Sequence, residues 1–197
     1  MVYLALRNSS LRIGGPNLGL SSKGMSIRWF EKRGMLWREL GGTVAQAKDR
    51  FPPPSLLLIQ VGSNNLTEIK SVDLVDNITS DILRIKLLFP NAKVVWSEIL
   101  MRRYWHNAND GKAVELTRKR LNLAVKNAVL KEDFCVILHP NIRAKEWNLH
   151  IFDGTHLSDT GNEVYLNNIQ GALEYFLSSD SNSHIFPSEL FKNKGEG

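Results

Sequence analysis

The chain has 197 residues, 43% of them hydrophobic and 23% charged, a balance typical of a globular domain and not of a disordered or fibrous chain. Its single cysteine, Cys135, excludes an internal disulfide framework and favours a reducing compartment. No apolar run approaches the ~18 residues of a membrane-spanning helix, and residues 1–6 do not form a signal peptide. We therefore expect an intracellular, cytoplasmic protein. The net charge of +5 suits a solvated basic surface or weak attraction to nucleic acid or anionic lipid.

The first elements in chain order are a strand and a helix. Residues 25–30 have the apolar character of a strand, and 35–48 predict a helix that Gly41-Gly42 weakens. Prolines at 52–54 exclude a helix interior. The continuous apolar run over 56–61 then predicts a strand buried on both faces of a sheet.

The remaining chain alternates between helix and strand. Helices are predicted over 72–89, 111–131 and 158–178, the last capped by Ser158 or Asp159, and strands over 93–98 and 134–138. Such alternation with short connections predicts parallel strands joined by right-handed crossovers. We expect one α/β domain over 1–178. The segment 179–197, rich in serine, asparagine and lysine, is expected to be a flexible C-terminal tail.

Polar residues follow three of the predicted strands at the point where each strand ends. These segments are 62–65, 101–106 and the stretch that leads to Asp153 and His156. In an open parallel sheet, ligands bind beyond the carboxyl ends of the strands. The sequence therefore predicts that the three segments meet at one edge of the sheet.

The residue types at this edge are those of a serine hydrolase. His156 can act as general base for a hydroxyl, and Asp153, three residues earlier, can hold its imidazole in one tautomer. Asn64 can donate its amide to an oxyanion, Gly62 allows a sharp turn beside the substrate, and Gly34 can offer a second backbone N–H. Taken singly, Asp-x-x-His also fits a helix cap beside a solvated histidine, and Gly-x-Asn also fits a plain turn.

Two other interpretations stay open. His150, Asp153 and His156 have a spacing that permits a metal site, although no further ligand cluster accompanies them. The run Arg102-Arg103-Tyr104-Trp105 mixes basic and aromatic side chains, as grooves for single-stranded nucleic acid do, and equally fits a surface lid that packs its tryptophan.

Several of these stretches resemble the blocks of the SGNH/GDSL hydrolase family. Its glycine-x-asparagine-aspartate block is similar to Gly62-Ser63-Asn64-Asn65, with Asn65 in place of the aspartate, and its aspartate-x-x-histidine block is similar to the segment from Asp153 to His156. Its lone oxyanion-hole glycine is similar to Gly34. The resemblance spans about 19–177. The stretches 34–37, 57–62, 89–97 and 153–158 more narrowly resemble SGNH-type domains carried by vertebrate retroelements.

The resemblance implies a flavodoxin-like three-layer sandwich with a parallel sheet. It also implies hydrolysis of small acyl esters through a serine acyl-enzyme, with no cofactor. In that scheme Asp153 and His156 are catalytic, Asn64 and Gly34 form the oxyanion hole, and Gly62 supports the turn.

The first block of the family, a strand followed by glycine-x-serine, is the part that this chain does not match well. In one alignment Val2-Tyr3 corresponds to the segment just after that serine, so the first strand is missing or degenerate and the chain is a truncated pseudoenzyme with weak or no activity. In the other alignment residues 1–6 are the strand, and Ser9 is the nucleophile of an active esterase, with Arg7 replacing the turn glycine. A third hypothesis is a module that binds nucleic acid or protein without catalysis.

Overall fold

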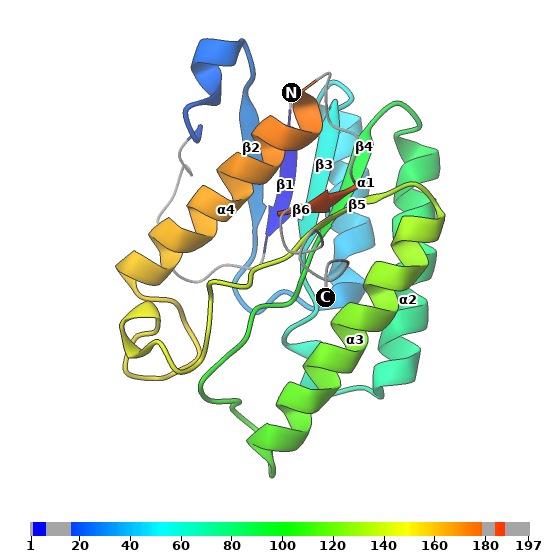
Figure 1. The fold of residues 1–197 in the computed structure, drawn as a ribbon. Helices are drawn as coiled ribbons and strands as arrows, with labels where there is room; N and C mark the ends of the chain where they lie inside the picture. Colours follow the sequence, from blue (N-terminus) through cyan, green and yellow to red (C-terminus); the bar gives the residue numbers. More distant parts are fainter. Residues whose placement is uncertain (1, 7–16, 179–183, 188–197) are drawn as a thin grey trace, which may run out of the picture.

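A parallel sheet of six strands in the order β2-β1-β3-β4-β5-β6 forms the centre of the computed structural model, which describes residues 2–6, 17–178 and 184–187 (Figure 1). The strands are β1 (Val2–Leu6), β2 (Ile27–Glu31), β3 (Leu56–Gln60), β4 (Lys93–Ser97), β5 (Cys135–Ile137) and β6 (Ile185–Phe186). The α-helices are α1 (Leu40–Arg50), α2 (Ser71–Leu88), α3 (Gly111–Lys131) and α4 (Asp159–Leu177). Short 3-10 helices are η1 (Leu20–Lys23), η2 (Trp37–Glu39), η3 (Asn65–Thr67) and η4 (Trp147–Leu149).

Strand β1 occupies a central place in this sheet. Val2 pairs with Ile27 of β2 and with Leu56 of β3, and both ladders are parallel along the whole strand. The expectation of a missing first strand is therefore corrected. The apolar residues at 2–6 are enough to complete two ladders of backbone hydrogen bonds, and the sheet is continuous from β2 to β6.

Helices cover both faces of the sheet, which gives the three layers that the resemblance to the SGNH/GDSL family implied. Helices α1, α2 and α3 pack on one face, where their apolar residues meet Leu57, Ile59 and Trp96. Helix α4 packs on the other face, against Leu58 and Val95. Every residue of β3 is buried, in keeping with a strand that has helices on both sides.

Two elements differ from the sequence expectation. The helix predicted over 35–48 begins later, because Leu36 is extended (ψ 155°) and donates its N–H to the Glu39 side chain at 2.8 Å, which fixes the chain before Leu40–Arg50. The expected tail contributes Ile185–Phe186 as β6, held by bonds such as that from Leu138 N–H to the Phe186 carbonyl at 2.8 Å. An apolar pair inside a polar segment is too short to show strand periodicity.

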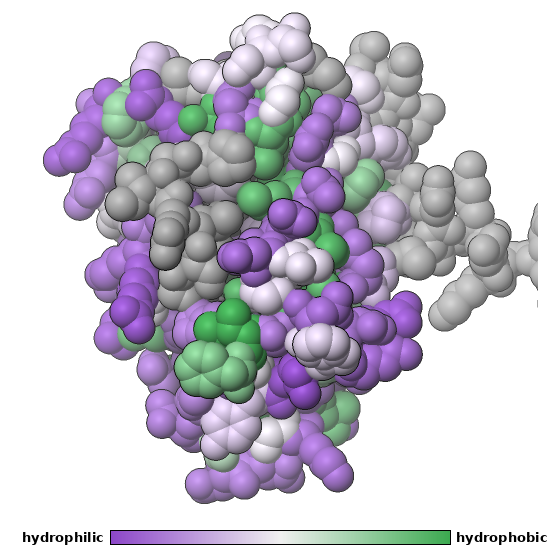
Figure 2. Space-filling view, turned by 90° about the vertical axis from the view of Figure 1, so that its left-hand side faces the viewer, coloured by the Kyte–Doolittle hydropathy of each residue, from purple (hydrophilic) through white to green (hydrophobic). Residues whose placement is uncertain are grey.

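Figure 2 shows one face of the molecule. The face turned to the viewer in Figure 2 is mostly hydrophilic, with small hydrophobic patches between polar side chains. None of the helices in the described ranges has the length and apolar character needed to cross a lipid bilayer.

Candidate active site

The turn that precedes α4 brings Asp153 and His156 into direct contact. The Nδ1–H of His156 donates to Oδ2 of Asp153 at 2.5 Å. The other carboxylate oxygen, Oδ1, accepts the backbone N–H of Thr155 at 2.8 Å and that of His156 at 2.9 Å. Gly154 sits at the centre of the turn with φ +63°, a conformation that L side chains rarely adopt. The hydrogen bonds within the turn thus fix the position of the carboxylate that holds the imidazole.

These bonds determine the ionisation of Asp153 and the free nitrogen of His156. Partial burial acts to raise the pKa of Asp153, but the hydrogen bonds from His156 and Thr155 outweigh it and lower that pKa to about 2. With Nδ1 committed to the carboxylate, Nε2 is the nitrogen left to accept a proton, and it has no partner among the described residues. The His156 side chain is 28% exposed, so a substrate can reach it.

The turn after β3 carries the candidate oxyanion donors. Gly62 has φ +111°, and a Cβ there would lie 3.3 Å from Cδ1 of Ile99, so this turn favours glycine. Asn64 donates Nδ2–H to the carbonyl of Met35 at 3.3 Å, which joins it to the loop that begins at Gly34. A primary amide has two N–H groups, so one remains available for a developing oxyanion. Gly34 itself has φ +69°.

Asn65, which stands where the resemblance has an aspartate, has a structural role. It is 4% exposed, and its Oδ1 accepts the backbone N–H of Trp37 at 2.9 Å. The asparagine oxygen supplies the acceptor that a carboxylate would supply. The replacement therefore leaves this connection between the two loops intact.

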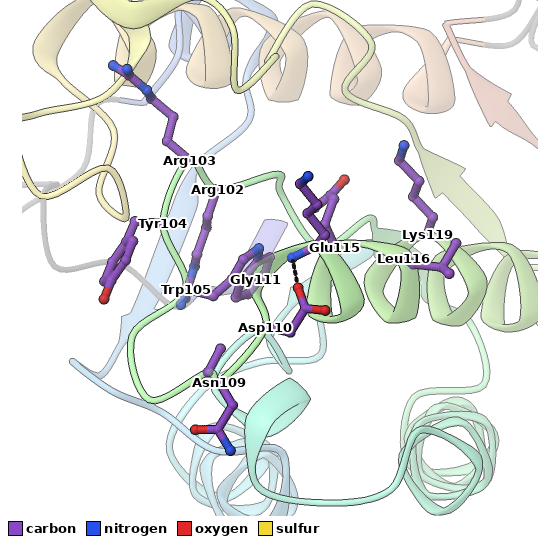
Figure 3. Close-up of a pocket in the computed structure, with 12 residues that line it drawn as sticks. Arg102, Arg103, Tyr104, Trp105, Asn109, Asp110, Gly111, Glu115, Leu116 and Lys119 are labelled. Carbon is purple, nitrogen blue, oxygen red and sulfur yellow. Dashed lines mark hydrogen bonds between the residues drawn. The ribbon is translucent and has the colours of Figure 1, made fainter.

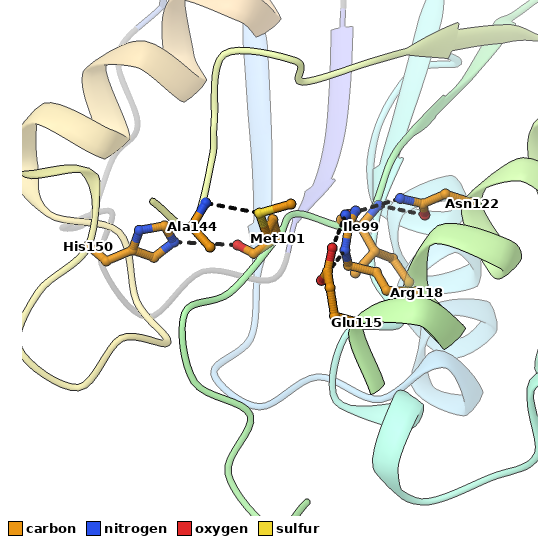
Figure 4. A network of polar contacts seen from close by, with 7 residues as sticks. All are labelled: Ile99, Met101, Glu115, Arg118, Asn122, Ala144 and His150. Atoms are coloured by element: carbon orange, nitrogen blue, oxygen red, sulfur yellow. Dashed lines mark hydrogen bonds and ion pairs between the residues drawn. The ribbon is translucent and has the colours of Figure 1, made fainter. Parts of the chain in front are cut away.

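A polar network fixes the loop that follows β4 (Figure 4). The carbonyl of Ile99 accepts from Nη1 of Arg118 at 2.7 Å and from Nδ2 of Asn122 at 3.0 Å, and the Ile99 N–H donates to the Asn122 side chain at 3.1 Å. Two residues on, Met101 contacts His150, whose Nε2 lies 3.4 Å from the Met101 carbonyl. Helix α3 holds the loop from one side, and His150, the residue directly after η4, holds it from the other.

This loop joins the two halves of the site. Arg102 donates to Oγ of Ser63 at 3.0 Å and lies 3.5 Å from Oδ1 of Asn64. The next two backbone N–H groups, of Arg103 and Tyr104, donate to the Gly154 carbonyl at 2.8 and 2.9 Å. The segments after β3 and β4 and the turn of the Asp153–His156 pair therefore lie together, at the carboxyl ends of parallel strands.

The other predicted residues fall in different places. Ser9 lies outside the described residues. Trp105 is only 4% exposed, with the Arg102 guanidinium 4.8 Å from its ring centroid, so its indole is not available to stack on bases. His150 is 5% exposed and turned toward the Met101 carbonyl. Within the described ranges, no group of three or more histidine, cysteine or acidic residues is placed to hold a metal ion.

Sequence reasoning missed a second histidine network, behind the site. Asn168 donates to Nδ1 of His139 at 3.1 Å, so the protonated Nε2 of this neutral ring donates to Oγ of Ser97 at 2.8 Å. Burial, with the nearby Arg118, lowers the pKa of His139 to about 3. Because Nε2 of His139 carries the proton, it cannot act as a base toward the Ser97 hydroxyl. Ser97 is also fully buried, so no substrate can reach it. The positions of Ser97 and His139 next to strand ends could have marked them in the sequence as structural polar groups.

The fold of this chain is similar to that of several solved hydrolases. A GDSL-like lipase from Bacteroides thetaiotaomicron superposes with a TM-score of 0.68 at 14% identity, over 89% of this chain and 88% of that one. A lipase/acylhydrolase from Enterococcus faecalis gives a TM-score of 0.66 at 15% identity, over 90% and 97% of the two chains. A protein from Slackia heliotrinireducens assigned to the SGNH hydrolases gives 0.63 at 17% identity, over 88% and 98%.

Comparison with protein-family models and with the sequences of curated proteins gives no match. The likeness is therefore one of three-dimensional structure, at identities far too low to carry an activity across. It agrees with the parallel sheet and with the helical layers on its two faces. The chain has the SGNH/GDSL hydrolase fold.

Proposed function

We propose that this protein hydrolyses small acyl esters, with His156 as general base and Asp153 as the residue that orients it. The observation that carries the proposal is the 2.5 Å hydrogen bond from His156 Nδ1 to Asp153, which selects the tautomer with a lone pair on Nε2. The two backbone N–H bonds to Oδ1 also occur in a plain turn, so the proposal depends on the separate bond between Oδ2 and the imidazole.

Ser9 is the proposed nucleophile. β1 ends at Leu6, which pairs with Gln60 of β3, and the turn that carries Asn64 begins two residues beyond Gln60. Because the two strands are parallel, the chain leaves both at the same edge of the sheet. Ser9 comes three residues after Leu6, and Asn64 comes four residues after Gln60, the partner of Leu6. The two residues therefore stand at similar distances along the chain from the ends of neighbouring strands. A missing strand no longer supports the expectation of weak or no activity, because β1 pairs with β2 and with β3.

The chemistry follows from these assignments. Nε2 of His156 takes the proton of the serine hydroxyl as the oxygen attacks the acyl carbon. The second N–H of Asn64 and the backbone N–H of Gly34 donate to the oxyanion, and the nearby Arg102 guanidinium favours its negative charge. Collapse expels the alcohol, which receives the proton from His156, and water then releases the acid by the same route.

The proposal includes neither a retroelement origin nor nucleic-acid binding. The retroelement origin depends on four short stretches of sequence and stays a prediction. Nucleic-acid binding through the loop at 102–105 is not part of the proposal, since Trp105 is buried and Arg102 is turned toward Ser63. Arg7, where the family turn has glycine, leads us to expect a modest rate of hydrolysis.

Hydrolysis of 4-nitrophenyl butyrate by four purified proteins tests the proposal. We expect turnover by the wild type, a loss of about 10³-fold or more in Ser9→Ala and His156→Ala, and near wild-type rates in the matched control Ser10→Ala. Absence of turnover above the buffer rate in the wild type would contradict hydrolase function. Full activity in Ser9→Ala would contradict the nucleophile assignment.

A further inference from the structure

A cavity of about 830 Å³ opens beside the catalytic turn, between the loop after β4 and the start of α3 (Figure 3). Four basic residues line it, and the acidic residues of the lining are Asp110 and Glu115. The basic residues are Arg102, Arg103, Lys112 and Lys119. Figure 3 shows the Arg103 side chain extending from the loop and that of Lys119 from α3, toward the same side of the view.

The acidic residues of this cavity are already engaged. Oδ1 of Asp110 accepts the backbone N–H groups of Lys112 and Ala113 at 2.8 and 3.2 Å and so caps α3. Glu115 forms a bidentate pair with Arg118, which points to the Ile99 carbonyl and not into the cavity lining. Glu115 is neutralised by Arg118, and Asp110 keeps its negative charge, so the four basic residues of the lining still outnumber the acidic charge.

Three of the basic side chains have no partner in the described part of the chain. No hydrogen bond or ion pair joins the side chain of Arg103, Lys112 or Lys119 to any described residue. Positive charges that line one cavity repel one another, and an anion bound in the cavity relieves that repulsion. The cavity therefore presents unpaired positive charge to a ligand.

The cavity is physically joined to the proposed site of ester hydrolysis. The Arg103 N–H donates at 2.8 Å to the carbonyl of Gly154, in the turn that holds Asp153 and His156. Arg102, also in the lining, reaches Ser63 and Asn64 on the oxyanion side. A substrate that places its acyl carbon at His156 can thus extend a neighbouring group into the cavity.

We propose that this cavity binds an anionic group, phosphate or carboxylate, carried by the ester substrate. This inference rests on the proposed ester hydrolysis and adds the class of substrate. A compact anion suits the site better than a nucleic-acid strand, because Tyr104 is the one lining aromatic that is exposed (57%), whereas Trp105 is buried. The unpaired guanidinium and ammonium groups supply charge-assisted hydrogen bonds to the anion.

Binding is measured first, by calorimetric titration of the full chain with butyl phosphate and, separately, with butyrate. The test variant is Arg103→Ala/Lys119→Ala, which keeps the backbone N–H at 103, and the matched control is Lys131→Ala, at the far end of α3. We expect the double variant to bind the preferred anion about 10-fold more weakly or worse, and the control to bind within about 2-fold of the wild type. The two titrations separate phosphate from carboxylate.

Equal binding by all three proteins would overturn the proposal. So would tighter, salt-dependent binding of a 15-nucleotide oligo(dT) that is lost in the same double variant, since that result would assign the basic residues to nucleic acid.

Kinetics then separate this inference from the proposed function. We expect the double variant to raise KM for 4-nitrophenyl hydrogen glutarate about 10-fold more than KM for the neutral 4-nitrophenyl butyrate. Equal effects on both esters would overturn the anionic subsite while hydrolysis stands. If no ester is turned over, ester hydrolysis fails, and the titrations still decide whether the cavity binds anions.

Discussion

Replacing Asp153 by asparagine changes one atom of the carboxylate that orients His156. Oδ1 of the asparagine can keep the two backbone N–H groups that Asp153 accepts at 2.8 and 2.9 Å. Its amide nitrogen must then face Nδ1–H of the imidazole, where Asp153 now accepts at 2.5 Å. Two donors would meet, and the ring avoids this by moving its proton to Nε2.

The magnitude follows from the tautomer. A ring protonated at Nε2 cannot take the proton of a serine hydroxyl, so the base is lost while the fold is kept. In a Ser-His-Asp hydrolase this exchange lowers kcat by about 10⁴-fold, which corresponds to about 5 kcal/mol in the activation barrier. We expect a loss of that order for Asp153→Asn. Asp73→Asn, a remote exposed aspartate in the first turn of α2, is the matched control and should leave the rate unchanged.

Two readouts check this reasoning. Initial rates with 4-nitrophenyl butyrate give the loss in kcat, and long-range ¹H–¹⁵N NMR of the His156 ring reports which nitrogen carries the proton. The NMR readout does not depend on turnover. A variant that keeps more than about a tenth of the wild-type rate, or a ring that stays protonated at Nδ1 in Asp153→Asn, would refute the argument.

The other predictions concern stability. Gly161→Ala would place a Cβ 2.1 Å from the carbonyl oxygen of Leu149, so we expect a loss of about 2–4 kcal/mol in urea unfolding; an unchanged midpoint would contradict the packing described. Gly42→Ala meets nothing within 4 Å inside α1 and should stabilise the protein by about 0.5–1 kcal/mol, measured in the same way. The pKa of Asp153, about 2, lies below its ordinary value of about 3.9, so its stabilisation is present above pH 4 and is lost as the pH falls toward 2. The unfolding free energies of wild type and Asp153→Asn should therefore converge by at most about 2 kcal/mol between pH 5 and 2, and a constant difference would argue against the shift.

Sequence patterns predicted the elements whose ends are set locally. The predicted helix over 111–131 coincides with α3, where the Asp110 side chain caps the first turn. The continuous apolar run at 56–61 predicted a buried strand, and the structure has β3 there, because a strand between two helical layers must be apolar on both faces. Ser158 caps α4 with a bond from the Gly161 N–H at 3.1 Å, one of the two caps considered.

Other features depend on partners far away in the chain. Residues 2–6 become a central strand because β2 and β3 offer edges on both sides, which a five-residue pattern cannot show. The contact of Asp153 with His156 was predictable because both lie in one turn. The inward position of Arg102 was not, because it depends on Ser63 and on the packing of Trp105.

The central claim is that a serine after β1 acts with the His156–Asp153 pair, and covalent labelling tests it most directly. Wild-type protein is treated with a fluorophosphonate, and the modified residue is located by intact-mass and peptide mass spectrometry. We predict one adduct, on Ser9, that is absent in Ser9→Ala and strongly slowed in His156→Ala, while Ser10→Ala labels as the wild type does. No adduct on the wild type, or an adduct that persists in Ser9→Ala, would contradict the account.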